Sequence, residues 1–492
     1  MKPCYESKKF CLVFLAGMLL LLLSGCAGGY FGDNAPTPAL LSADNLNLIF
    51  VVSPDLAYDP LGDINSTTAN LSNQGLQRAL LMGTYLKQQL LGENNVTGIH
   101  VLEPMTHLQT VNNYPDMAAI GFIQQFALLN QFTMQGTTAN SYPIGVRYGG
   151  PGDVPIGVIQ PSSYTPDCQG LAFNDASGSN VALVTGIIQA NVPGFYVFSA
   201  PWETTSALLA NIKTTKGYNL NLPTTYMGPN LVYVISIAPS GDASLVTFDS
   251  KLSPPATYPV LPRPVASASD RQQTYFSYTR TGGVNGVVIP PGTNTNQTVY
   301  MIRHAEAHPV SSFENANFVG AGQWRALALP NALSCALRGQ SSPTQVYSID
   351  PAQSFTLGNF DFSYVRPSLT VLPYAIANNL PYNLVASFFI GVDPTDKDEA
   401  EATIAFFFNG GNFSNQIILL AWEHEHYPPL ITYLLKSYGG SDSDPVPPLF
   451  WPQSDYDTIW TVTLDAEGNL TVNNGLCEGI DSTKLPATAP LF

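Results

Sequence analysis

Apolar positions alternate between continuous runs and helical spacing through most of the chain. Residues 46–52 (LNLIFVV) and 298–302 (TVYMI) are runs of apolar and β-branched residues, typical of strands buried on both faces of a sheet. The segment after the first run predicts a helix, because apolar and small residues recur at three- and four-residue intervals at Leu76, Ala79, Leu80, Gly83, Leu86 and Leu90. Strands that alternate with helices predict an α/β fold.

The order of these features occurs twice. The matching segments are 46–60 with 298–309, 70–90 with 317–333, 195–212 with 417–434, and 230–248 with 457–472. We therefore predict two diverged tandem α/β domains, 45–250 and 298–480. The linker between them, 251–297, is rich in Pro, Ser, Thr and Gly.

The N-terminus predicts export. Three lysines precede a continuous apolar run, 11–23, which is too short to span a bilayer comfortably and is typical of a signal peptide. The sequence Leu-Ser-Gly-Cys that ends at Cys26 resembles a bacterial lipoprotein signal, which implies a signal peptide over 1–26 and a lipid on Cys26. Ala27 resembles the pattern sorted to the outer membrane, so we expect a lipid-anchored protein of the bacterial cell envelope with a tether over 27–44. An ordinary cleaved signal or an anchor helix is the alternative.

Composition narrows the function classes. Hydrophobic residues make up 45% and aromatic residues 11% of the 492, which supplies enough core material to exclude a disordered chain. The net charge is −16, with only 19 Lys and Arg, which argues against nucleic-acid binding and against docking on anionic lipid by charge. The six cysteines contain no CxxC pair and indicate no disulfide framework.

Four of the six histidines lie in two short motifs of the second half. His304 and His308 follow the run 298–302, and His424 and His426 follow the run 417–422. In a parallel α/β sheet, ligand sites gather at the carboxyl ends of the strands. We therefore expect the two motifs to meet, although they lie about 120 residues apart.

Four motifs in the second half resemble, in their order, the signature of the histidine phosphatase superfamily. They are VYMIRHAE at 299–306, Gln-x-Arg-Ala at 323–326, Tyr-x-Arg-Pro-x-x-Thr at 364–370, and Trp-Glu-His at 422–424. The resemblance covers 298–480 well and 46–250 weakly. It implies an α/β fold of two tandem phosphoglycerate-mutase-like three-layer domains with mostly parallel sheets, of which the first is degenerate.

The same resemblance implies roles for single residues. His304 would attack phosphorus and form a phosphohistidine, Arg303 and Arg366 would grip the phosphoryl oxygens, and His424 would donate to the transferring group. These roles make physical sense, because forked guanidinium donors match the charge that a transferring phosphoryl group spreads over three oxygens. An imidazole is a nucleophile only when it is unprotonated, so its tautomer must be fixed by a hydrogen bond. No cofactor and no metal is implied.

The acid that protonates the leaving group has no sharp match. The candidates are the carboxylates near the motifs and in the stretch 392–402, namely Glu306, Asp393, Asp396, Glu399 and Glu423. The Trp-Glu-His-Glu-His run also leaves open whether His424 or His426 points into the site. We favour His424, because it stands where the family has its second histidine.

The first half lacks these residues. It reads Ser53-Pro54 at the Arg-His position, residues near Thr106 at the second arginine, and Trp202-Glu203-Thr204 at the second histidine. We predict an inactive domain that packs on the second as an intramolecular pseudo-dimer.

The sequence therefore favours a phosphatase that hydrolyses a phosphomonoester, with a phosphorylated small molecule or phosphate as its ligand. One alternative is a non-catalytic lipoprotein that binds a partner or an anionic ligand. Another is a metal-dependent hydrolase, because HAEAH and HEH are rich in histidine. The two arginines would repel a cation and argue against it.

Overall fold

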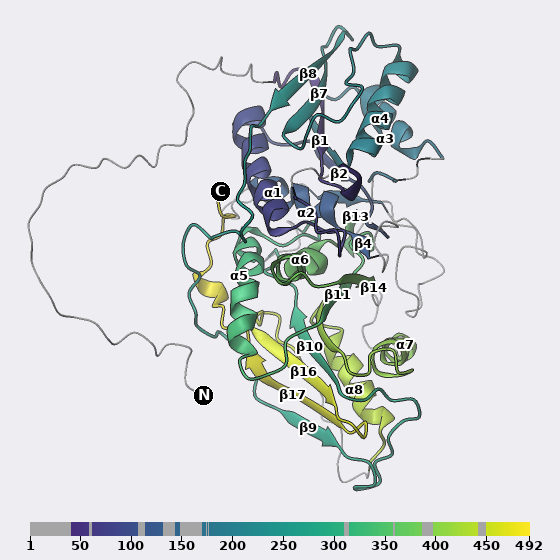
Figure 1. Ribbon diagram of the computed structural model, residues 1–492, viewed down its shortest axis with the longest axis vertical. Coiled ribbons are helices and arrows are strands. Elements are labelled where there is room, and N and C mark those ends of the chain that lie inside the picture. Colours follow the sequence, from purple (N-terminus) through teal and green to yellow (C-terminus); the bar gives the residue numbers. More distant parts are fainter. Residues whose placement is uncertain are drawn as a thin grey trace, which may run out of the picture. The chain divides into compact units, whose positions relative to one another are not determined.

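The computed structural model describes residues 41–58, 62–106, 114–130, 143–147, 170–173, 175, 177–308, 314–357, 360–385, 397–440 and 449–492. Residues from 40 onward form one compact unit with a mixed α/β fold and two mostly parallel sheets (Figure 1). Cys26 and nearly all of the tether lie outside the described residues. No helix in the described part is long and apolar enough to cross a membrane.

The first sheet has the strand order β5-β2-β6-β1-β7-β8. Its first four strands pair in parallel, and β7 and β8 add antiparallel pairs at one edge. The strands are β1 (Leu46–Val52), β2 (Gly98–Val101), β5 (Ile144–Val146), β6 (Gly194–Ala200), β7 (Leu231–Ile237) and β8 (Ala243–Asp249). All seven residues of β1 are buried, including Asn47, the one polar residue in its apolar run.

The second sheet has the order β14-β11-β15-β10-β16-β17-β9. Its first four strands are again parallel, and the rest pair antiparallel. The strands are β9 (Ser277–Arg280), β10 (Gln297–Arg303), β11 (Gln345–Ile349), β14 (Tyr382–Val385), β15 (Ile417–Trp422), β16 (Thr458–Leu464) and β17 (Leu470–Cys477).

The two sheets correspond strand by strand over their first six positions. Three of the four pairs of segments that the sequence matches supply strands at equivalent positions, for example β1 with β10 and β6 with β15, and the fourth pair supplies a helix in each half. The prediction of two mostly parallel sheets in an α/β chain is confirmed. The segment predicted as a linker also supplies β9, which extends the second sheet at its antiparallel edge.

The helices follow the same repeated order. They are α1 (Asn73–Tyr85), α2 (Ala118–Leu129), α3 (Ser179–Ala190) and α4 (Trp202–Lys216) in the first half, then α5 (Gly320–Ala336), α6 (Arg366–Asn378), α7 (Lys397–Phe408) and α8 (Tyr427–Ser437). Ser72 caps α1 by accepting a hydrogen bond from the Gly75 amide. All six positions that predict the apolar face are buried, four of them on α1 and two, Leu86 and Leu90, in the helical segment Leu86–Leu91 that continues it. A side chain at Gly83 would lie 2.6 Å from the Phe126 amide nitrogen, so this glycine allows α1 and α2 to approach closely.

The remaining elements are short. They are β3 (Met105–Thr106) with β4 (Pro115–Asp116), β12 (Ser354–Leu357) with β13 (Phe360–Ser363), and the helical turns η1 (Leu56–Tyr58), η2 (Leu86–Leu91) and η5 (Ser482–Lys484).

A buried pair of amides joins α2 of the first half to the loop before α5. The Nε2 of Gln124 donates to the Oδ1 of Asn317 (2.9 Å), and the Nδ2 of Asn317 donates back to the Oε1 of Gln124 (2.8 Å). A second bond joins Gln323 of α5 to Gln125 (3.1 Å), whose own amide donates to the Pro490 carbonyl (2.6 Å). These polar groups are satisfied by one another, so the contact depends on specific partners in both halves.

Candidate functional site

The two histidine motifs meet at the carboxyl ends of neighbouring parallel strands. Arg303 is the last residue of β10 and pairs with Trp422, the last residue of β15. The His304 amide donates to the Trp422 carbonyl (3.0 Å) and so adds one more hydrogen bond to the ladder between β10 and β15. His304 and the Glu423-His424 pair therefore leave the sheet side by side, as the positions of the apolar runs predict.

One tautomer of His304 is fixed. Its Nδ1 lies 2.8 Å from the Ala305 carbonyl oxygen, which can only accept, so Nδ1 carries the proton and Nε2 keeps its lone pair. The Ala305 amide donates to Thr370 of α6 (2.8 Å), which holds this turn in place. Burial, and then the charges of Arg366 and Arg303, hold the pKa of His304 well below its usual value. The imidazole is therefore neutral at pH 7, the state that a nucleophile needs.

Arg303 lies under the site with its guanidinium 3.9 Å from the Tyr456 ring centroid. Its Nη1 donates to the backbone carbonyls of Gln453 and Asp455. Its Nε is buried and has no hydrogen-bond partner in the described part of the protein. A buried donor without a partner carries a free-energy cost, which an anionic ligand within reach would remove.

Arg366 begins α6. Its Nε donates to the Asn317 carbonyl (3.0 Å), and its Nη2 forms an ion pair with Glu314. Its positive charge is one of the causes that lower the pKa of His304. Glu314 escaped the sequence analysis, because it lies in a loop without periodicity or motif.

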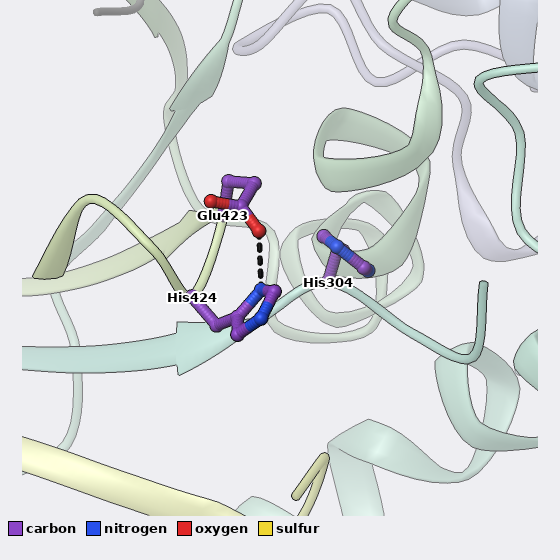
Figure 2. Close-up of side chains that lie close together, drawn as sticks. All are labelled: His304, Glu423 and His424. Carbon is purple, nitrogen blue, oxygen red and sulfur yellow. Dashed lines mark ion pairs between the residues drawn. The ribbon is translucent and has the colours of Figure 1, made fainter. Parts of the chain in front are cut away.

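Glu423, His424 and His304 form one buried cluster. Single ligand atoms of the three residues all lie within 4.8 Å of one another. Figure 2 shows the Glu423 carboxylate directed at the His424 ring, with His304 beside them, and the dashed line marks the ion pair between Glu423 Oε1 and His424 Nδ1. The Nε2 of His424 makes no hydrogen bond within the described part.

Glu423 is held as a carboxylate. Burial opposes its ionisation, but hydrogen bonds from His424 and His426 outweigh burial and keep the pKa of Glu423 well below its usual value. Its Oε2 also accepts from the Glu425 amide (2.7 Å). His426 contacts this carboxylate and stacks on Trp422, whereas His424 belongs to the cluster with His304. The geometry therefore favours His424 as the histidine that faces a ligand.

The other predicted acids lie elsewhere or outside the described residues. Glu306 accepts from the Arg325 Nε (2.8 Å). Glu399 lies on α7, but its side chain is outside the described part, as are Asp393 and Asp396. Glu425, which the sequence analysis passed over, places its Oε1 4.0 Å from the His424 Nε2, and its side chain is about half exposed. The only sign of Glu425 in the sequence is its position directly after His424.

Arg325 joins Glu306 to the C-terminal strand. Its guanidinium is fully buried and contacts Glu478 (2.6 Å) as well as Glu306. Burial raises the pKa of Glu478 to about 8 against the pull of Arg325, and Asp457 and Glu306 add to the rise. In the first half, Arg78 of α1 is likewise buried and pairs with Asp63 (2.7 Å). Arg78 and Arg325 therefore have the same structural role in the two halves, each as the centre of a buried ion pair.

The pKa of Glu478 predicts how stability depends on pH. Its ordinary value is 4.5, so between about pH 5 and 8 the folded state holds a proton that the unfolded chain has released. This group's contribution to stability therefore falls as pH rises through that window. We expect Glu478→Gln to reduce the fall by up to about 1.4 kcal/mol per pH unit. Urea unfolding at several pH values between about 5 and 8.5 measures it, with the exposed Glu467→Gln as control. Equal slopes for Glu478→Gln and the unaltered protein would refute the assignment.

The first sheet carries different residues at the equivalent positions. The Ser53 amide donates to the Ala200 carbonyl (3.0 Å), the same rung that His304 makes with Trp422. Ser53 therefore stands at the His304 position and Val52 at the Arg303 position, one residue earlier than the sequence comparison placed them. Trp202 lies two residues after Ala200, as His424 lies two residues after Trp422, so Trp202 stands at the His424 position. The equivalent of Arg366 is Ala118, the first residue of α2, rather than a residue near Thr106.

Comparison with known proteins adds no assignment. No protein-family model matches the chain, and no curated protein matches it significantly.

Proposed function

We propose that the second half of the chain is a phosphatase that hydrolyses phosphomonoesters through a phosphohistidine on His304. The observation that carries the proposal is a neutral, buried His304 whose Nδ1 is held by a carbonyl oxygen, with the charges of two arginines acting on its ring and His424 in the same cluster. Such a site favours a group that is itself an electrophile and carries negative charge on several oxygens.

The reaction balances in two steps. The Nε2 lone pair of His304 attacks phosphorus, the ester P–O bond breaks, and the leaving alcohol takes a proton. Water then attacks the phosphohistidine, the P–N bond breaks and phosphate leaves, while the proton of the water restores the acid. Arg303 and Arg366 offset the charge of the phosphoryl oxygens throughout.

We infer that Glu425 supplies the proton. Glu423 is ionised and Glu306 is bound to Arg325, whereas Glu425 is solvent-accessible and lies next to the His424 Nε2. A donor to the leaving group must lie near the site and reach toward solvent, and the half-exposed Glu425 beside His424 meets both conditions.

A metal-dependent hydrolase is the second candidate, because His304, Glu423 and His424 also offer three converging ligand atoms. A cation there would meet the charges of Arg303 and Arg366, which act on His304. The arginines therefore favour the phosphatase.

One assay separates these possibilities. We expect the full chain, purified in detergent, to release phosphate from 4-nitrophenyl phosphate and from ethyl phosphate with excess EDTA present. Glu425→Gln should lower kcat for ethyl phosphate at least about tenfold more than for the nitrophenyl ester, because nitrophenolate leaves without a proton. Activity that EDTA abolishes and Zn²⁺ restores would favour the metal reaction. A folded protein that is inactive on both esters would favour a binding lipoprotein.

The family assignment is part of the same proposal. We infer two tandem histidine-phosphatase-like domains, the first without chemistry, which pack as an intramolecular pseudo-dimer. The equivalent strand orders and the residues Val52, Ser53, Ala118 and Trp202 support it. The motif around Cys26 supports lipid anchoring in a bacterial envelope.

A further inference from the structure

A pocket opens directly beside the cluster of His304, Glu423 and His424. It has a volume of about 460 Å³ and runs along one face of α8. His424 and Glu425 line its inner end, together with Gln453, whose carbonyl also holds Arg303. A phosphoryl group on His304 would therefore have its leaving group at the end of this pocket that His424 and Glu425 line.

The walls of the pocket are apolar and rich in rings. Besides the three residues at its inner end it is lined by Pro428, Pro429, Thr432, Tyr433, Lys436, Leu449, Phe450 and Trp451. Trp451 is rigid, because it stacks on Trp460 at 5.0 Å between centroids and donates its Nε1–H to the Asp455 carbonyl (2.9 Å). Phe450 leaves 72% of its surface exposed, an unusual position for a large aromatic side chain.

We propose that this pocket binds the organic part of the substrate, and that the substrate is a phosphomonoester of an alcohol with a flat, apolar ring system. The inference rests on the proposed phosphatase activity. Prolines and aromatic rings present flat faces, on which a ring stacks with little loss of conformational entropy. The volume suits one ring system of modest size.

The test compares esters whose leaving groups are all primary alcohols. For the full chain in detergent we expect kcat/KM for 2-(2-naphthyl)ethyl phosphate to exceed that for ethyl phosphate about 30-fold or more, since the ring leaves water on binding. Hexyl phosphate, which is flexible, should gain clearly less. A ratio near one in an active enzyme would overturn the pocket and leave the phosphatase standing. A hexyl ester that matches the naphthyl ester would overturn the preference for rings.

A matched pair of variants locates the effect. Thr432→Trp places a ring inside the pocket and should bring the naphthyl-to-ethyl ratio to within about threefold of one. Ser437→Trp, on an exposed position of the same helix outside the pocket, should keep the ratio of the unaltered protein. Circular dichroism checks that both variants fold. A ratio that Thr432→Trp leaves unchanged would contradict the location.

A binding measurement keeps this proposal separate from the activity. If no ester is hydrolysed, the proposed function fails, and calorimetric titration with 2-(2-naphthyl)ethanol then decides the pocket. Binding that Thr432→Trp abolishes and Ser437→Trp retains would support the pocket. Absence of binding to the unaltered protein would overturn it.

Discussion

His304→Ala is expected to lower phosphate release by about 10⁴-fold or more, because it removes the atom that we propose attacks phosphorus. In the proposed mechanism the cluster's second histidine, whose Nδ1 contacts the Glu423 carboxylate, donates to the phosphoryl group and does not attack it. The measurement is kcat/KM for 4-nitrophenyl phosphate with EDTA present.

Trapping the phosphohistidine tests the proposed mechanism directly. Brief reaction followed by alkaline denaturation should leave one phosphate on the peptide that contains His304, and acid should remove it. His100→Gln is the matched control, because it replaces a histidine on β2 of the first sheet, and it should stay within about twofold of the unaltered protein. More than a tenth of the activity in His304→Ala, with no trapped phosphate, would contradict the mechanism.

Arg325→Met is expected to cost about 3–5 kcal/mol of the free energy of unfolding, because it leaves the buried Glu306 carboxylate without its counter-charge and the Glu478 carboxyl group without its hydrogen-bond donor. Two carboxyl groups and two further acceptors depend on this guanidinium. Urea unfolding at pH 7 measures the loss, and the exposed Arg338→Met should change stability by less than about 0.5 kcal/mol.

The double variant tests the cause. Adding Glu478→Gln to Arg325→Met should recover part of the loss, since it removes one of the stranded carboxyl groups. A loss below about 1 kcal/mol in Arg325→Met, or a double variant less stable than the single one, would show that the arginine does not balance these charges.

The sequence predicts the strands and the meeting of the two histidine motifs well, for a simple physical reason. Buried parallel strands are continuous apolar runs, and the residue after such a run must lie at the sheet's edge. His304 and His424 both stand within two residues of a strand end, so the apolar pattern alone places them.

Other parts of the site depend on information that the pattern does not contain. Glu314 reaches Arg366 across a gap of 52 residues from a loop, and loops carry no periodicity. The sequence comparison places Ser53 at the position of Arg303, whereas the structure places it at the position of His304. The two differ by one residue because only the hydrogen-bond ladder shows which residue makes the last strand pair. Glu306 is a candidate acid in the sequence but pairs with Arg325 in the structure. Nothing in the sequence marks Arg325 and Glu478 as its neighbours.

The amide pair of Gln124 and Asn317 links the first half of the chain to the second. The same Asn317 whose side chain binds Gln124 offers its carbonyl to Arg366. A change at either amide leaves a buried donor or acceptor unmatched, so a substitution at one position calls for a compensating substitution at the other. The first half thus forms part of the support against which the second half positions Arg366.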